Sequence, residues 1–348
     1  MASRKLRSSE LVTALGVVIL ATLYVGASFA APVDYLPTGQ QVSLFWPPTG
    51  IGLAAFFYLR PLVTAPTILV SSFLLNASFG RPLGPSLAAA VATACGLTAI
   101  YLLLRWVDFH SRLDRLRDVL ALVFLGALVG GMILGWASVG ALVLTGVFPP
   151  GLQWRMTLLW GMSFGTGVLI CTPALLVLRH ARWPRRIRPL RVVEAVGLEA
   201  AAVAVVLLIA LTAAQPLFLA FPVVVWAALR FQMAGAAPVA LFLSAATVYT
   251  QTGAGPWGGQ LVSEMGVIEG FIASMTLTAL LLAVIITERD RAYRDIRHVS
   301  DQLLLAVDKL DRRLRPRPSE IAGRRDEIAQ RRDPMAERQE SRAAQPDR

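Results

Sequence analysis

Long apolar segments separated by short polar ones run through most of this sequence. About ten such segments lie between Leu11 and Ile286, most of them close to the roughly 20 residues that a helix needs to cross a hydrocarbon core about 30 Å thick. The apolar runs are continuous, whereas strands of a membrane barrel would alternate between apolar and polar residues. We therefore predict an all-α transmembrane bundle of about eight to ten spans. The segments are 11–30, 43–59, 62–79, 83–104, 119–147, 157–178, 192–212, 217–229, 233–250 and 267–287.

The lysine and arginine residues of the short polar segments indicate how the bundle is oriented. Short cytoplasmic loops carry an excess of these residues. Basic residues precede the first span and are frequent in the segments 105–117 and 179–191, whereas 32–41 contains no Lys or Arg. The two kinds of loop alternate along the chain, so we expect both termini in the cytoplasm. The expected location is the cell membrane, which the chain crosses several times.

The composition agrees with a lipid environment and argues against several classes of function. The chain is 55% hydrophobic, and its formal net charge of +11 comes mostly from short segments beside the apolar runs, which does not suit a nucleic-acid partner. The lipid bilayer is the expected partner. The cysteines and histidines share no metal-ligand spacing, and no phosphate-loop or nucleophile motif is present. We expect no cofactor, no metal site and no catalytic residue.

After Thr287 the sequence becomes rich in Arg, Asp, Glu and Gln. Apolar residues at alternating spacings of three and four predict one apolar seam on a helix that continues from the last span and ends before Pro316. The rest of the chain has too few apolar residues to build a core. The predicted domains are 1–10, 11–288, 289–315 and 316–348, namely a cytoplasmic N-terminus, the bundle, a signalling or coiled-coil helix, and a charged disordered tail. The seam consists of Ile296, Val299, Leu303, Ala306 and Leu310.

The motif Trp46-Pro47-Pro48-Thr49-Gly50 opens the second apolar segment. Two prolines remove backbone donors, and irregular backbone at that depth is tolerated where it lines a cavity. The alternative is that Pro47 and Pro48 only begin a helix while Trp46 anchors it at the membrane interface. Both interpretations remain open at this point.

An ordered set of motifs gives the bundle a resemblance to a known family. Its members are Trp46-Pro47-Pro48-Thr49-Gly50, Asn76, Trp160, Gly167-Val168-Leu169 with Pro173, Phe221-Pro222, Trp226-Ala227-Ala228-Leu229-Arg230-Phe231, and Gly253-Ala254-Gly255-Pro256-Trp257. Over about 12–288 the chain resembles the bacterial membrane-associated sensor domain of type one, MASE-one. The resemblance implies a sensory input in the inner membrane, usually fused through a cytoplasmic helix to a kinase, cyclase, phosphodiesterase or phosphatase.

Two features depart from the pattern of that family. Its members often carry an acidic residue shortly before the Gly-Val-Leu stretch, where this chain has Ser163-Phe164-Gly165-Thr166. No output domain follows the connecting helix in this sequence. We therefore expect the output to reside on a separate cytoplasmic signalling protein, with a homodimer as a further expected assembly. Ile296, Val299, Leu303 and Leu310 are the residues expected to transmit the signal.

Aromatic and polar residues expected toward the outer half of the bundle, together with Arg230 of the family motif, are the candidates for ligand contacts. Each has a simpler explanation: hydrogen bonding between helices for Asn76, a cytoplasmic boundary charge for Arg230, and solvation for Glu264 and Glu269. The candidate ligand-binding residues are Trp46, Pro47, Pro48, Asn76, Trp226, Arg230 and Trp257.

Two functions from different classes follow. The first is a membrane sensor that transmits the state of a ligand or of the membrane through its C-terminal helix. The second is a transporter, suggested by short broken segments such as 217–229, although charged residues are rare within the spans. Glycine pairs spaced by four, such as Gly131 with Gly135 and Gly161 with Gly165, are interpreted as helix packing positions.

Overall fold

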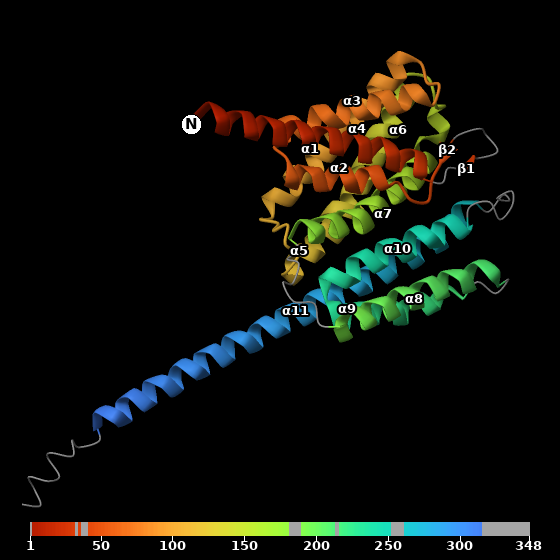
Figure 1. Ribbon diagram of the computed structural model, residues 1–348. Helices are drawn as coiled ribbons and strands as arrows, with labels where there is room; N and C mark the ends of the chain where they lie inside the picture. Colours follow the sequence, from red (N-terminus) through yellow and green to blue (C-terminus); the bar gives the residue numbers. More distant parts are fainter. Residues whose placement is uncertain are drawn as a thin grey trace, which may run out of the picture. The chain divides into compact units, whose positions relative to one another are not determined.

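The computed structural model describes residues 2–31, 34–35, 41–180, 189–212, 216–251 and 261–314, and these residues are almost entirely helical (Figure 1). The predicted all-α fold is confirmed; its one extended feature there is a two-residue antiparallel pairing of Asp34 with Val42 and Tyr35 with Gln41. In chain order the elements are α1 (Ala2–Ala30), β1 (Asp34–Tyr35), β2 (Gln41–Val42), α2 (Pro47–Tyr58), α3 (Pro61–Ser78), α4 (Leu83–Trp106), α5 (Leu116–Ala121), the π-helix η1 (Leu122–Val129), α6 (Gly130–Leu144), the short 3₁₀ helix η2 (Pro150–Leu152), α7 (Gln153–His180), α8 (Pro189–Leu211), η3 (Leu217–Leu219), α9 (Ala220–Phe231), α10 (Met233–Gln251) and α11 (Leu261–Leu314).

Eight helical segments in the described part of the chain are long and apolar enough to cross a membrane. The 12-residue helices α2 and α9 are shorter. The long predicted span near 119–147 is one unbroken segment, Leu116–Leu144, in which α5, η1 and α6 follow each other directly. This count agrees with the predicted eight to ten spans.

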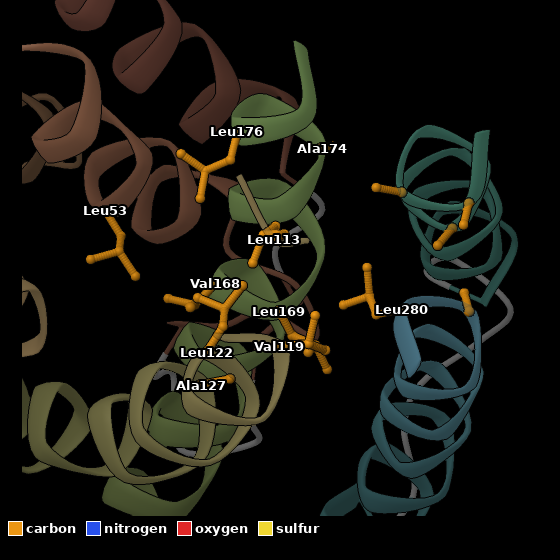
Figure 2. Close-up of a cluster of buried hydrophobic side chains, with 14 of the residues drawn as sticks. Leu53, Leu113, Val119, Leu122, Ala127, Val168, Leu169, Ala174, Leu176 and Leu280 are labelled. Atoms are coloured by element: carbon orange, nitrogen blue, oxygen red, sulfur yellow. The ribbon is translucent and has the colours of Figure 1, made fainter. Parts of the chain in front are cut away.

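Helix α7 is the central helix of the bundle. Residues of its most apolar window are 72% buried, against 17% in α1 and in α8. It packs against α2, α6, η1 and α10. A buried cluster therefore gathers side chains from helices far apart in sequence, and Figure 2 shows Leu53 of α2, Leu122 of η1, Val168 of α7 and Leu280 of α11 among its members.

Glycine lets α6 and α7 approach closely. A Cβ atom added to Gly131 would lie 2.5 Å from the carbonyl oxygen of Gly161, and one added to Gly135 would lie 2.7 Å from the Gly161 nitrogen. Between helices in lipid, such close backbone contact replaces the missing hydrophobic driving force. The packing interpretation of these glycines is confirmed.

The chain divides into two compact units, residues 1–289 and residues 290–348. The helix predicted beyond the last span is present as the C-terminal part of α11, which is continuous to Leu314 (Figure 1). In the second unit the apolar side chains of this helix are exposed, with Ile296 62%, Val299 53%, Leu303 61% and Leu310 58% accessible. Leu304, Leu305 and Val307 are exposed as well and widen the apolar surface.

Candidate ligand cavity

The motif that opens α2 fastens this helix to α7. Pro47 is the first helical residue and follows Trp46, where a missing N–H costs no helical hydrogen bond. The hydroxyl of Thr49 donates to the carbonyl oxygens of Trp46 at 2.8 Å and of Phe164 at 3.0 Å. A Cβ atom on Gly50 would lie 2.1 Å from the carbonyl oxygen of Gly167, so glycine permits the crossing. The prolines begin the helix, as in the simpler interpretation.

A cavity of about 80 Å³ adjoins this crossing, and we call it the polar cavity. One water molecule needs about 10–15 Å³ of such space, so the cavity has room for roughly five to eight non-hydrogen atoms. Its walls are formed by helices α1, α2, α3, α4, α6 and α7, by the residues that precede α2, and by the turn between α3 and α4. The lining residues are Tyr24, Val42, Ser43, Trp46, Thr49, Ser72, Leu75, Asn76, Phe79, Arg81, Ala89, Thr93, Ser138, Trp160, Ser163 and Phe164.

Arg81, in the turn between α3 and α4, supplies the positive charge of the polar cavity. It donates a hydrogen bond to the side-chain oxygen of Asn76, and its Cζ atom lies 5.8 Å from the ring centroid of Trp160, a cation–π contact. The Asn76 amide in turn donates to the carbonyl oxygen of Ser72 at 2.8 Å, which holds its oxygen toward Arg81. Desolvation by burial lowers the pKa of Arg81 below its usual value.

No carboxylate forms an ion pair with Arg81 within the described residues. A guanidinium has five N–H donors, and Asn76 takes one of them. A second unmet hydrogen-bonding group lies on the wall formed by α6, where the hydroxyl of Ser138 is buried with no hydrogen-bond partner. The polar cavity therefore contains a cation, and a buried hydroxyl without a partner lies in its wall.

The structure brings together some of the sequence-predicted residues and separates others. Trp46 and Asn76 line the polar cavity, with Pro47 and Pro48 directly beside Trp46. Trp226 and Arg230 lie on α9 and are not among its lining residues. Arg230 forms an ion pair with Glu194 of α8 at 2.5 Å. Trp257 falls outside the described residues.

Arg81, Ser138 and Trp160 are among the residues of the polar cavity that were not sequence-based site candidates. Arg81 lies in the turn after α3, and its place five residues after Asn76 is the signal that could have found it. Asn76 was expected to bond across helices; its described bonds instead go to Ser72 within α3 and to Arg81 in the adjacent turn. That expectation was wrong because the turn folds its arginine back over the end of α3.

A second cavity of about 230 Å³ contains an acidic residue, and we call it the Glu269 cavity. Glu269 on α11 is 5% exposed, so the expectation that it is solvated was wrong. Among the described residues it has no hydrogen-bond or ion-pair partner. The other lining residues come from η1, α6, α7 and α11 and are mostly apolar: Val123, Phe124, Ala127, Leu128, Met132, Gly161, Met162, Gly165, Thr166, Leu169, Gly270 and Ala273.

Eight apolar helices around a buried core, with a charged cavity inside, define the chain as a multi-pass helical membrane protein. Residues 15–290, most of the chain, match the family model MASE1. The chain belongs to the MASE1 family, a family of membrane-associated sensory domains, and the resemblance found in the sequence is confirmed. No curated protein and no solved structure gives a significant match.

Proposed function

We propose that this chain is a sensory input that binds a small molecule in the polar cavity and transmits its presence through α11 to a separate cytoplasmic signalling protein. The single observation that carries the proposal is the continuity of α11, which leaves the membrane unit and ends in a helix with exposed apolar residues. A signal that shifts or rotates the last span would move that helix as well. The stimulus must favour one of two states of the bundle.

A helical connection supports transmission from the polar cavity to α11. Ser138 in the cavity wall belongs to the unbroken segment Leu116–Leu144. At the other end of this segment, the backbone N–H of Leu116 donates a 2.8 Å hydrogen bond to the carboxylate of Glu288 on α11. A carboxylate is favoured at a helix N-terminus, which carries partial positive charge. Movement of α6 on ligand binding would therefore reach α11 immediately before its cytoplasmic part.

The arginine-rich loops support an orientation with both termini in the cytoplasm. In that orientation the polar cavity opens toward the extracytoplasmic side, because it lies at the C-terminal end of α3 and the N-terminal end of α4. Glu288 and the exposed helix after it then face the cytoplasm. The stimulus would be sampled outside and reported inside.

We propose that the apolar seam of α11 pairs with a second copy of the same helix, and that the pair presents the signal to the signalling protein. Two copies in one membrane emerge parallel and in register, which suits a seam with spacings of three and four. The exposure of Leu303, 61%, leaves its side chain available for such pairing.

Cysteine cross-linking in membranes tests this pairing. In a chain with Cys95 and Cys171 replaced by serine and alanine, Leu303→Cys is expected to give cross-linked dimers. Asp301→Cys, on the opposite face of the helix, is the matched control and is expected to stay monomeric. Equal cross-linking at both positions would contradict the seam. Deletion of 296–310 should leave membrane insertion intact and abolish signalling.

One observation favours the second candidate function, transport. Ionisable residues buried within a membrane often mark ion or proton paths, and Glu269 is such a residue. Purified protein in proteoliposomes separates the two functions. Uptake of a solute that depends on Glu269 would favour transport, whereas a sensor gives no flux.

A further inference from the structure

We infer that the polar cavity is a site for a small monocarboxylate, an anion with a short apolar chain, held by the guanidinium of Arg81 and the hydroxyl of Ser138. This inference rests on the proposed function and names the chemical class of its stimulus. It starts from two unmet groups on different elements, a cation without a carboxylate among the described residues and a buried hydroxyl without a partner.

The charge of the cavity selects an anion. Arg81 is held in place by Asn76 on one side and by the ring of Trp160 on another, so little side-chain freedom is lost when a ligand binds. A guanidinium presents planar paired donors that match a carboxylate in geometry. The hydroxyl of Ser138 can donate to the same anion or to a second oxygen on the ligand.

The remaining wall residues favour a ligand that carries a single negative charge and an apolar chain. Leu75, Phe79 and Phe164 are apolar, and Trp160 presents an aromatic ring. Phosphate carries more charge and more acceptor oxygens than one guanidinium and a few hydroxyls satisfy. The volume of about 80 Å³ suits a short acid better than the acyl chain of a lipid. The ligand expected from these walls resembles propionate or lactate rather than a phosphate or a lipid headgroup.

Isothermal titration calorimetry of the full chain in lipid nanodiscs tests the assignment. The carboxylate probes are acetate, propionate, butyrate and lactate. Propionamide is the control of the same size as propionate but without charge, and inorganic phosphate is the control anion that is not a carboxylate. We expect saturable binding of at least one carboxylate and none of propionamide. Binding of propionamide as tight as propionate, tighter binding of phosphate, or no binding of any carboxylate at millimolar concentrations would each overturn the inference.

Variants locate the site within the protein. Arg81→Gln is expected to weaken carboxylate binding at least about tenfold, because a charge-assisted hydrogen bond is lost. Ser138→Ala, which removes a hydroxyl with no partner in the protein and so leaves the fold intact, is expected to weaken it about threefold to tenfold. Arg155→Gln is the control, since it removes an exposed arginine near the start of α7 outside the cavity.

The outcomes of these variants are distinguishable from those of the proposed sensor function. Unchanged affinity in both Arg81→Gln and Ser138→Ala, in protein with the melting temperature of the natural chain, would overturn the assignment of the site. The cross-linking of Leu303→Cys does not depend on any carboxylate. A failure of carboxylate binding together with seam-specific cross-linking would therefore refute the ligand class and leave the sensor proposal standing.

Discussion

The polar cavity and the Glu269 cavity each contain one charged residue among their lining residues. Only the charged residue of the polar cavity has interaction partners in the described part of the chain. Arg81 has a hydrogen bond from its guanidinium to Asn76 and an aromatic ring beside it. Glu269 has no described partner and lies among glycine, methionine and aliphatic side chains. The first arrangement is a preorganised receptor for an ion of opposite charge. Glu269, in contrast, is a buried polar group, and no hydrogen bond or ion pair with a described residue compensates for its desolvation.

The difference also predicts how the two cavities should respond to mutation. Loss of Arg81 should affect binding more than stability, because its partners are few and the turn is at the edge of the bundle. Loss of the Glu269 carboxyl should affect stability more than binding. The two cavities share no lining residue, so each set of variants is a control for the other.

The largest expected effect comes from Gly167→Ala, a change at the α2–α7 crossing beside the polar cavity. An added Cβ atom would lie 2.1 Å from the carbonyl oxygen of Trp46 and 2.4 Å from the Thr49 hydroxyl. Overpacking of this kind typically costs about 1–3 kcal/mol, and contact with backbone places it at the upper end. Gly140→Ala in α6 is the control, because its Cβ would meet nothing within 4 Å. Thermal unfolding in detergent measures the stability of both variants. Equal melting temperatures of Gly167→Ala and Gly140→Ala would contradict the close α2–α7 crossing.

The Glu269 cavity should give the opposite result. Glu269→Leu replaces a buried polar group without a described partner by an apolar one and is expected to raise stability by about 1–3 kcal/mol. The stability of Glu269→Gln should fall between those of the natural chain and Glu269→Leu. Asp301→Asn, exposed on the C-terminal part of α11, should leave stability unchanged. A melting temperature lowered by Glu269→Leu would indicate that the carboxyl has a partner. Propionate affinity should be unchanged in all three.

A third change examines the contact between the bundle and α11. Glu288→Ala removes the acceptor for the Leu116 backbone N–H, so that amide should exchange with solvent faster. Hydrogen–deuterium exchange of peptides that contain Leu116 measures this, with Asp301→Ala as the control on the same helix. Unchanged exchange would mean that Glu288 does not hold the start of α5, and the proposed connection from the polar cavity to α11 would lose its last step.

Sequence patterns predicted the helices and two cavity residues, for reasons that the structure makes clear. The apolar runs are long, and lipid requires the backbone to satisfy its own hydrogen bonds, so helix positions follow directly. The positions of Trp46 and Asn76 near the outer ends of neighbouring helices followed from counting residues along those helices. That they line one cavity depends on tertiary packing, which includes the crossing of α2 and α7 at Gly50.

The remaining cavity residues could not be predicted because they depend on tertiary contacts. A serine such as Ser138 in an apolar helix normally bonds within its own helix, and nothing in sequence marks one that does not. The role of Arg81 depends on how a short turn directs its side chain. Glu269 was expected at the surface because the packing of α11 against η1 and α7 is not encoded in local hydropathy.

The smallest expected effect concerns Arg230, one of the candidate ligand-binding residues predicted from the sequence. Its guanidinium pairs with Glu194 on the exposed side of α8 and α9, and neither residue lines either cavity. Exposed ion pairs contribute little, so Arg230→Gln should leave propionate affinity within about twofold of the natural chain. Calorimetry beside Arg81→Gln makes the comparison direct. A loss of affinity in Arg230→Gln as large as in Arg81→Gln would mean that ligand binding depends on α9, and that the polar cavity alone does not define the site.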